Sequence, residues 1–199
     1  MKDTTKIKGA TYNDDISGLL LDTNVQYTLQ EIYVYEAKNI TKATLKYLSA
    51  KPNKKLAPFT YEWFLQLHKD MFGDVWDWAG KLRQVELSIG VKAYMVPIEL
   101  KKLVDDLKYW DKNKTFCVVE TAARLHHRAV QIHPFKNGNG RWSRMLANIY
   151  LKQNGLNPTK WNEDLLSKEN PLRDDYIESL KLADKADYSK LIELQSNTL

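Results

Sequence analysis

An all-α fold with one small β-hairpin is the architecture that this sequence predicts. Most segments place apolar residues at the 3.6-residue spacing of a helix with one buried face. Only residues 84–96 alternate apolar and polar side chains with the period of two that marks strands. The length of 199 residues suits one substantial hydrophobic core, so we expect a single domain.

Composition narrows the classes of protein. The chain is 43% hydrophobic with no apolar run approaching twenty residues, so we expect no membrane span, and no secretory signal follows Met1; the cytoplasm is the expected compartment. A net charge of +5 would suit an acidic partner, but the lysines are scattered, so we do not expect nucleic-acid binding as the function. Cys117 lies in an apolar run and is expected to be an inert core thiol.

The first half of the chain predicts an arm and two helices. Residues 1–22 are polar and read as an irregular N-terminal arm. Residues 28–49 carry apolar side chains on more than one face, so much of that helix should be buried. Thr60 is a suitable N-cap for a helix over residues 61–71, and His68 on its apolar stripe is expected in the core.

The alternating segment 84–96 predicts the hairpin. Gly90 near its middle places the turn around residues 88–90. Two short strands cannot form a domain alone, so the hairpin should pack on the helical body. An exposed hairpin can accept a partner's extended backbone as an added strand, and a purely structural hairpin remains the alternative.

The second half predicts further helices. Pro97 suits the first turn of a helix, and Asn154-Gly155 and Asn170-Pro171 mark later boundaries. The expected helices cover residues 97–112, 115–131, 141–150, 174–183 and 188–195. His126 and His127 lack the spacing and the cysteine partners of a zinc site.

Residues 132–144 concentrate the chemistry. Gly138 and Gly140 permit backbone conformations in which successive N–H groups converge on one anion, and the apolar period that follows opens a helix there. The N-terminus of a helix has unpaired N–H groups and a partial positive charge, so phosphate is the expected ligand there. Arg141 and Arg144 lie three residues apart, on one helical face, where they could grip further phosphates.

His133 stands immediately before this loop. An imidazole that is neutral near pH 7 can take a proton from an attacking hydroxyl. The alternative is a packing or turn residue, which is the ordinary role of a histidine before proline.

The stretch His-Pro-Phe-x-x-Gly-Asn-Gly-Arg-x-x-Arg at residues 133–144 resembles the signature of the Fic family. Residues 72–83 resemble the family's upstream Trp-Ala-Gly-x-x-Arg segment, and the arrangement over residues 23–189 looks most like the bacterial subgroup called mobile mystery protein B. The resemblance implies a single Fic domain over residues 23–199, after the irregular N-terminal arm of residues 1–22.

The resemblance also implies a function, the transfer of AMP from ATP to a Ser, Thr or Tyr hydroxyl of a target protein, with His133 as general base. Residues 84–96 would be the flap that docks the target, through Ser88, Ile89, Gly90 and Val91. The implied nucleotide-binding residues are Phe135, Lys136, Asn137, Gly138, Asn139, Gly140, Arg141 and Arg144.

One position departs from the family pattern. Asn137 stands where the family usually has an acidic residue that helps to bind Mg²⁺ or Mn²⁺, and a neutral amide is a poorer ligand for a hard cation. Two alternatives follow: transfer of another phosphate-containing group by the same site, or a catalytically weak nucleotide-binding regulator. A basic nucleic-acid module is a third.

The resemblance raises the question of inhibition. Many family members carry a Ser/Thr-x-x-x-Glu-Gly/Asn motif whose Glu pairs with the arginine that matches Arg144. None of Glu31, Glu36 and Glu193 completes that motif here, so we expect Arg144 to be unpaired. Activity would then be controlled by a separate antitoxin-like or helix-turn-helix companion.

Overall fold

The computed structural model describes residues 16–22, 24–166 and 169–196, and it is helical apart from its connecting loops. In chain order the elements are α1 (Leu29–Leu48), α2 (Tyr61–Phe72), the 3₁₀ turn η1 (Ala93–Met95), α3 (Val96–Asn113), α4 (Val118–Ile132), α5 (Asn139–Gln153), α6 (Glu163–Leu166), α7 (Pro171–Asp184) and α8 (Ser189–Ser196). The predicted all-α class is therefore confirmed. Within the described ranges no helix has both the length and the apolar character needed to cross a bilayer.

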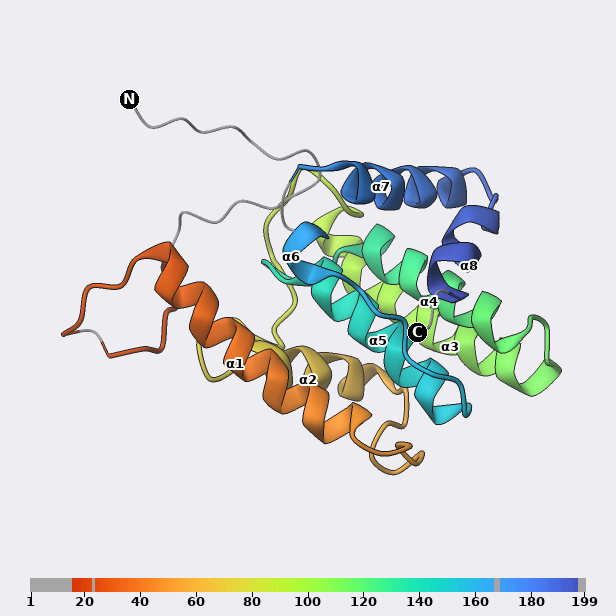
Figure 1. Ribbon diagram of the computed structural model, residues 1–199, viewed down its shortest axis with the longest axis horizontal. Helices are drawn as coiled ribbons and strands as arrows, with labels where there is room; N and C mark the ends of the chain where they lie inside the picture. The colour runs from red at the N-terminus through yellow and green to blue at the C-terminus, as the bar shows by residue number, and fades with distance from the viewer. Residues whose placement is uncertain (1–15, 23, 167–168, 197–199) are drawn as a thin grey trace.

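α4 and α5 form the centre of the molecule, joined by the loop that follows His133 (Figure 1). α1 and α2 pack on one side of α5, whereas α3 and α8 contact α4. Eleven of the fifteen residues of α5 are buried, as expected of a helix enclosed by others. Trp142 of α5 lies in the core, and its indole Nε1 donates to the Phe64 carbonyl of α2 at 3.2 Å.

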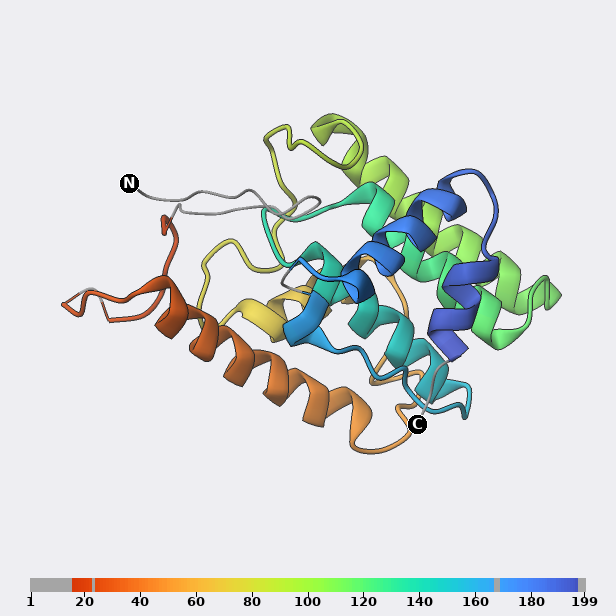
Figure 2. The ribbon, with the colours of Figure 1, turned by 45° about the horizontal axis from the view of Figure 1, so that its top comes forward.

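α1 begins as predicted but is less buried than predicted. Thr28 and Glu31 form a reciprocal capping box that satisfies N–H groups of the first turn. α1 lies along the outer edge of the bundle (Figure 2), so one stripe alone faces the core. The expectation that apolar residues on several faces would be buried is wrong, because large apolar side chains of α1 are exposed: Leu29, Tyr33, Val34, Tyr35 and Leu45.

The other predicted helices form with small differences at their ends. Thr60 caps α2, its Oγ1 accepting from the Trp63 N–H at 3.2 Å. α4 starts later than expected because Cys117 has extended backbone angles and is the N-cap. Cys117 is consequently exposed, and its assignment to the core was wrong. The short α6 was not predicted.

Residues 84–96 form no strand in the structure, so the hairpin part of the prediction is not found. The guanidinium of buried Arg83 donates to the Val85 and Val91 carbonyls, which a two-stranded ladder would otherwise use. The Arg83 N–H donates to the Pro134 carbonyl at 3.0 Å. Within the segment, the Val91 N–H donates to the Ile132 carbonyl at the end of α4, at 3.4 Å.

The end of the N-terminal arm lies outside the helical core. Residues 1–15 are not among the described residues. In residues 16–22, Leu19 and Trp76 form an isolated antiparallel bridge, and Leu20 donates to the Val75 carbonyl at 2.8 Å. Residues 16–22 contain no helix.

Candidate active site

α4 ends at Ile132 and His133 is its C-cap, which places the imidazole at the start of the loop. His133 has a left-handed backbone with φ 53°, and its N–H donates to the Ala129 carbonyl at 3.2 Å. The side chain is 5% exposed. Burial, helped by the positive charge of Arg83, lowers the pKa of His133 to about 4, although a backbone hydrogen bond with Val130 opposes the shift. His133 is therefore neutral at pH 7, the form that can accept a proton.

Asn139 holds the two ends of the loop together. Its Oδ1 accepts from the Phe135 N–H at 2.8 Å, and its Nδ2 donates to the Phe135 carbonyl at 2.8 Å. Both groups of this side chain are thereby used inside the protein. The structure thus assigns Asn139 to loop geometry, in addition to the phosphate contact that the resemblance implies.

His68 supports the loop from below. Its ring stacks on Phe135 with a centroid distance of 3.6 Å. Its Nδ1 accepts from the Gly80 N–H at 3.0 Å, so Nε2 carries the hydrogen and donates to the Asn137 carbonyl at 3.0 Å. The expected core position of His68 is confirmed; the sequence pattern did not indicate its hydrogen bond to the loop.

Gly138 and Gly140 differ in backbone conformation and in what an added Cβ would contact. Gly138 has φ +76°, and an added Cβ would lie 2.6 Å from the ring of Phe72. Gly140 is inside α5, and its added Cβ would lie 3.3 Å from Arg144 Nη1. Only Gly138 matches the predicted need for an unusual conformation. The Gly138 N–H donates to Asn137 Oδ1 at 2.6 Å, so this N–H already has an acceptor within the protein.

Arg141 and Arg144 diverge from the start of α5. Arg141 Nη1 lies 2.5 Å from Glu36 Oε2, and buried Glu36 also accepts from Trp76 Nε1 at 2.6 Å. Glu36 thus joins α1 to the helix that carries the arginines. Its role was missed because it rests on a contact between residues far apart in sequence.

Arg144 makes a two-bond pair with Glu163 of α6. Arg144 Nε lies 2.7 Å from Glu163 Oε1, and Nη2 bonds Oε2. The expectation that Arg144 would be unpaired is therefore wrong. No sequence pattern around Glu163 indicates a pair with Arg144, because only the fold brings Glu163 to α5.

The predicted docking segment lies beside His133 although it is no hairpin. An added Cβ on Gly90 would be 2.6 Å from His133 Cβ, and the Val91 N–H donates to the Ile132 carbonyl at 3.4 Å. Ser88 and Ile89 are exposed next to this contact. Lys136, farther along the loop, donates to Ser17 Oγ of the arm at 3.2 Å.

The residues at the loop do not form a cage for Mg²⁺. In the part of the chain that the structure describes, no three His, Cys, Asp or Glu side chains gather as a metal site. Asn137 Oδ1 is used by the Gly138 N–H. The protein atoms here therefore do not fit a tightly held hard cation, which prefers carboxylate oxygens.

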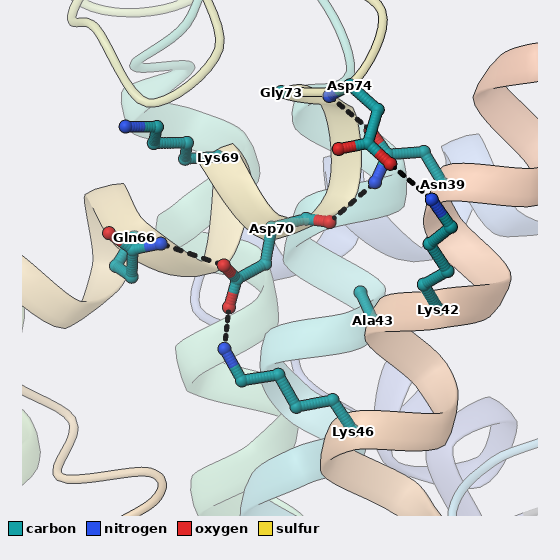
Figure 3. Close-up of a pocket in the computed structure, with 9 residues that line it drawn as sticks. All are labelled: Asn39, Lys42, Ala43, Lys46, Gln66, Lys69, Asp70, Gly73 and Asp74. Atoms are coloured by element: carbon teal, nitrogen blue, oxygen red, sulfur yellow. Dashed lines mark hydrogen bonds and ion pairs between the residues drawn. The ribbon is translucent and has the colours of Figure 1, made fainter.

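A surface groove lies elsewhere, between α1 and α2. Figure 3 shows its lining closed by polar contacts, with Lys46 bonded to Asp70 and Lys42 to Asp74, each at 2.6 Å. The Asn39 side chain bridges the Asp70 carbonyl and the Asp74 N–H. None of its lining residues belongs to the loop of residues 133–144.

Fold and site together define an all-helical protein built around a glycine loop, a buried neutral histidine and two arginines at the start of α5. Residues 58–151 match the family model described as Fic/DOC family, so the chain contains a Fic/DOC domain.

Curated relatives agree with this assignment. The chain is 31% identical over 147 residues to the protein adenylyltransferase Fic of Drosophila grimshawi and 30% identical over 149 residues to that of Aedes aegypti. These alignments cover 72% and 73% of this chain but only 29% and 28% of the relatives. The chain thus spans less than a third of the length of these relatives.

Solved structures share the fold. Fic-1 of C. elegans aligns with a TM-score of 0.69 at 23% identity, over 88% of this chain and 52% of that one. BepC of Bartonella tribocorum, solved with bound AMPPNP, aligns with a TM-score of 0.63 at 16% identity, over 96% of this chain and 93% of that one.

Proposed function

We propose that this chain transfers AMP from ATP to a hydroxyl group of a target protein. Its relatives are named protein adenylyltransferases, and the observation that carries the proposal is the neutral His133 beside the loop that opens α5. Phe135 to Gly140, with Arg141 and Arg144, are the proposed nucleotide-binding residues.

In the proposed reaction His133 takes the proton of the target hydroxyl. The hydroxyl oxygen forms a bond to the α-phosphorus of ATP, the bond from that phosphorus to the bridging oxygen breaks, and pyrophosphate leaves. Positioning and charge stabilisation by the loop and the arginines supply the remaining catalysis. Residues 88–91 are proposed to align the target, since Gly90 among them lies against His133. Mg²⁺ or Mn²⁺ would enter with the ATP phosphates.

A second candidate function is nucleotide binding without efficient transfer. The use of Asn137 Oδ1 by Gly138, and the ion pairs that occupy both arginines, favour it. An antitoxin-like or helix-turn-helix companion, and membership of the mobile mystery protein B subgroup, remain predictions from the resemblance.

Labelled ATP with Mg²⁺ or Mn²⁺ and a cell lysate separate the two candidates. Transfer requires a labelled protein whose label is lost with His133→Ala, by roughly the 10²–10⁴-fold that general-base catalysis contributes. His127→Ala is the matched control, because His127 lies on α4, the helix that His133 caps, but bonds Tyr188 and Asp184. ATP binding without label supports the regulator, and equal labelling by wild type and His133→Ala removes His133 from the reaction.

A further inference from the structure

Arg144 is enclosed on two sides, by a carboxylate and by an aromatic ring. Beyond the pair with Glu163, the guanidinium carbon lies 5.5 Å from the centroid of the Tyr176 ring, within the range of a cation–π contact. Arg144 and Tyr176 are both buried. Tyr176, on α7, therefore provides a fixed surface that does not depend on Glu163.

Tyr176 is itself held by His126 of α4. The Tyr176 hydroxyl lies 2.9 Å from His126 Nε2, and the two rings stack at 5.7 Å. Trp161 makes a T-shaped contact with each of the two rings. We call His126, Trp161 and Tyr176 the aromatic box.

The direction of the hydrogen bond in the box follows from α8. Gln195 Nε2 donates to Thr159 Oγ1 at 2.7 Å, which turns its Oε1 toward His126 Nδ1 at 3.4 Å. Burial lowers the pKa of His126 to about 3, so the ring is neutral and has one N–H. Because Gln195 Oε1 can only accept, that N–H is on Nδ1, and Nε2 accepts a hydrogen bond from the Tyr176 hydroxyl.

The Tyr176 oxygen, whose hydrogen is directed to His126, can only accept toward the rest of its surroundings. Because the Tyr176 oxygen is an acceptor beside the Arg144 guanidinium, which carries only donors, it favours one orientation of that guanidinium. A rotamer-rich arginine positioned in advance loses less entropy when it binds phosphate.

We propose that Tyr176, oriented by His126 and Gln195, is a positioning residue that holds Arg144 for the distal phosphates of a nucleotide. This inference rests on the proposed function, because it gives the aromatic box a task only if Arg144 binds phosphate. It makes docking of α7 and α8 a determinant of nucleotide affinity.

Tyr176→Phe tests the proposal, because it removes the hydroxyl and keeps the ring. ATP and AMP affinities of the intact chain are measured by calorimetric titration, with thermal stability recorded in parallel. We expect ATP affinity to fall by about two- to tenfold, the range of one typical hydrogen bond, and AMP affinity to stay unchanged. Tyr188→Phe is the matched control: the Tyr188 hydroxyl lies 3.1 Å from Nδ1 of the neighbouring His127, and its ring contacts Arg124 instead.

A double-mutant comparison separates positioning from general loosening. In an Arg144→Ala background, Tyr176→Phe should have no further effect on ATP affinity. The proposal is overturned if Tyr176→Phe weakens ATP and AMP equally, if Tyr188→Phe has the same effect, or if the effect persists without Arg144. If Arg144→Ala lowers ATP affinity and Tyr176→Phe does not, the positioning role of Tyr176 is refuted while the phosphate site of the proposed function stands. If Arg144→Ala leaves ATP affinity unchanged, the phosphate site of the proposed function fails with it.

Discussion

Gly138 shows how one residue carries both backbone and packing demands. Its φ of +76° disfavours any side chain, and the ring of Phe72 lies only 2.6 Å from where a Cβ would stand. Gly155, after α5, also has a positive φ of +86°, but its nearest contact is the end of the flexible Lys51 side chain at 3.5 Å. The two glycines therefore separate backbone strain from steric conflict.

We predict that Gly138→Ala destabilises the protein by about 2–5 kcal/mol, the sum of left-handed strain and overpacking. Gly155→Ala should cost only about 1–2 kcal/mol, from strain alone. Urea unfolding of both variants and the wild type measures the difference. Equal losses would mean that Phe72 yields without cost and that the loop is not tightly packed.

Asn137 is the position at which the metal prediction can be tested. We predict that Asn137→Asp strengthens Mg²⁺ binding in the presence of ATP, because one carboxylate oxygen can accept from Gly138 while the other meets the cation. Mg²⁺ titration at saturating ATP measures the change. Asn113→Asp, at the exposed end of α3, is the control for added charge. If both variants respond alike, position 137 does not contact the metal.

At the level of elements, α1 and α6 both place a carboxylate on an arginine at the start of α5. Glu36 is buried and also holds Trp76, so its pair belongs to the core. Glu163 is about half exposed and comes from a helix of four residues. The second pair is therefore the easier one for a phosphate to displace.

We predict that Glu163→Gln raises ATP affinity by roughly three- to tenfold, because a competing acceptor on Arg144 loses its charge. The same change should lower stability by about 1–2 kcal/mol, less than for a fully buried pair, since Glu163 is partly solvated. Calorimetric titration and urea unfolding measure the two effects. Glu178→Gln, in a surface pair with Lys181, should change neither. Unaltered ATP affinity in Glu163→Gln would show that Arg144 and nucleotide do not meet.

For the molecule as a whole, buried histidines link stability to pH. Burial lowers the pKa values of His68 and His126 to about 3 and of His133 to about 4, all below the ordinary 6.5. Between these values and 6.5 the unfolded chain binds protons that the folded chain does not. The contribution of these neutral histidines to the free energy of unfolding is therefore fully present above about pH 6.5, and it is lost as the pH decreases toward 4.

We predict a loss of up to about 1.4 kcal/mol per histidine for each pH unit below 6.5. Urea unfolding at pH 7.5, 6.5 and 5.5 (values chosen to bracket the ordinary histidine pKa of about 6.5) measures the slope. The side-chain signals of these three histidines in NMR should not titrate above about pH 5. A flat stability profile, or a His133 signal with a midpoint near 6.5, would contradict the buried neutral state.

Local pattern determined most of the helices and the site's position in the chain. Capping residues such as Thr28 and Thr60, and apolar spacing, act within a few residues, and so does the conformational freedom of Gly138. Periodicity misled at residues 84–96, because alternation describes side chains and cannot show that the Arg83 guanidinium takes the carbonyls of a ladder.

The amino-acid sequence by itself determined the helical class, the loop over residues 133–144 and the candidacy of His133. Tertiary structure alone decided that His133 is buried and neutral, that Glu36 and Glu163 pair with the two arginines, and that Tyr176, bonded to His126, lies against Arg144. The physical reason is range. Helix propensity and backbone conformation are set by neighbours in sequence, whereas desolvation, ion pairing and ring contacts depend on residues that only the packed helices bring together.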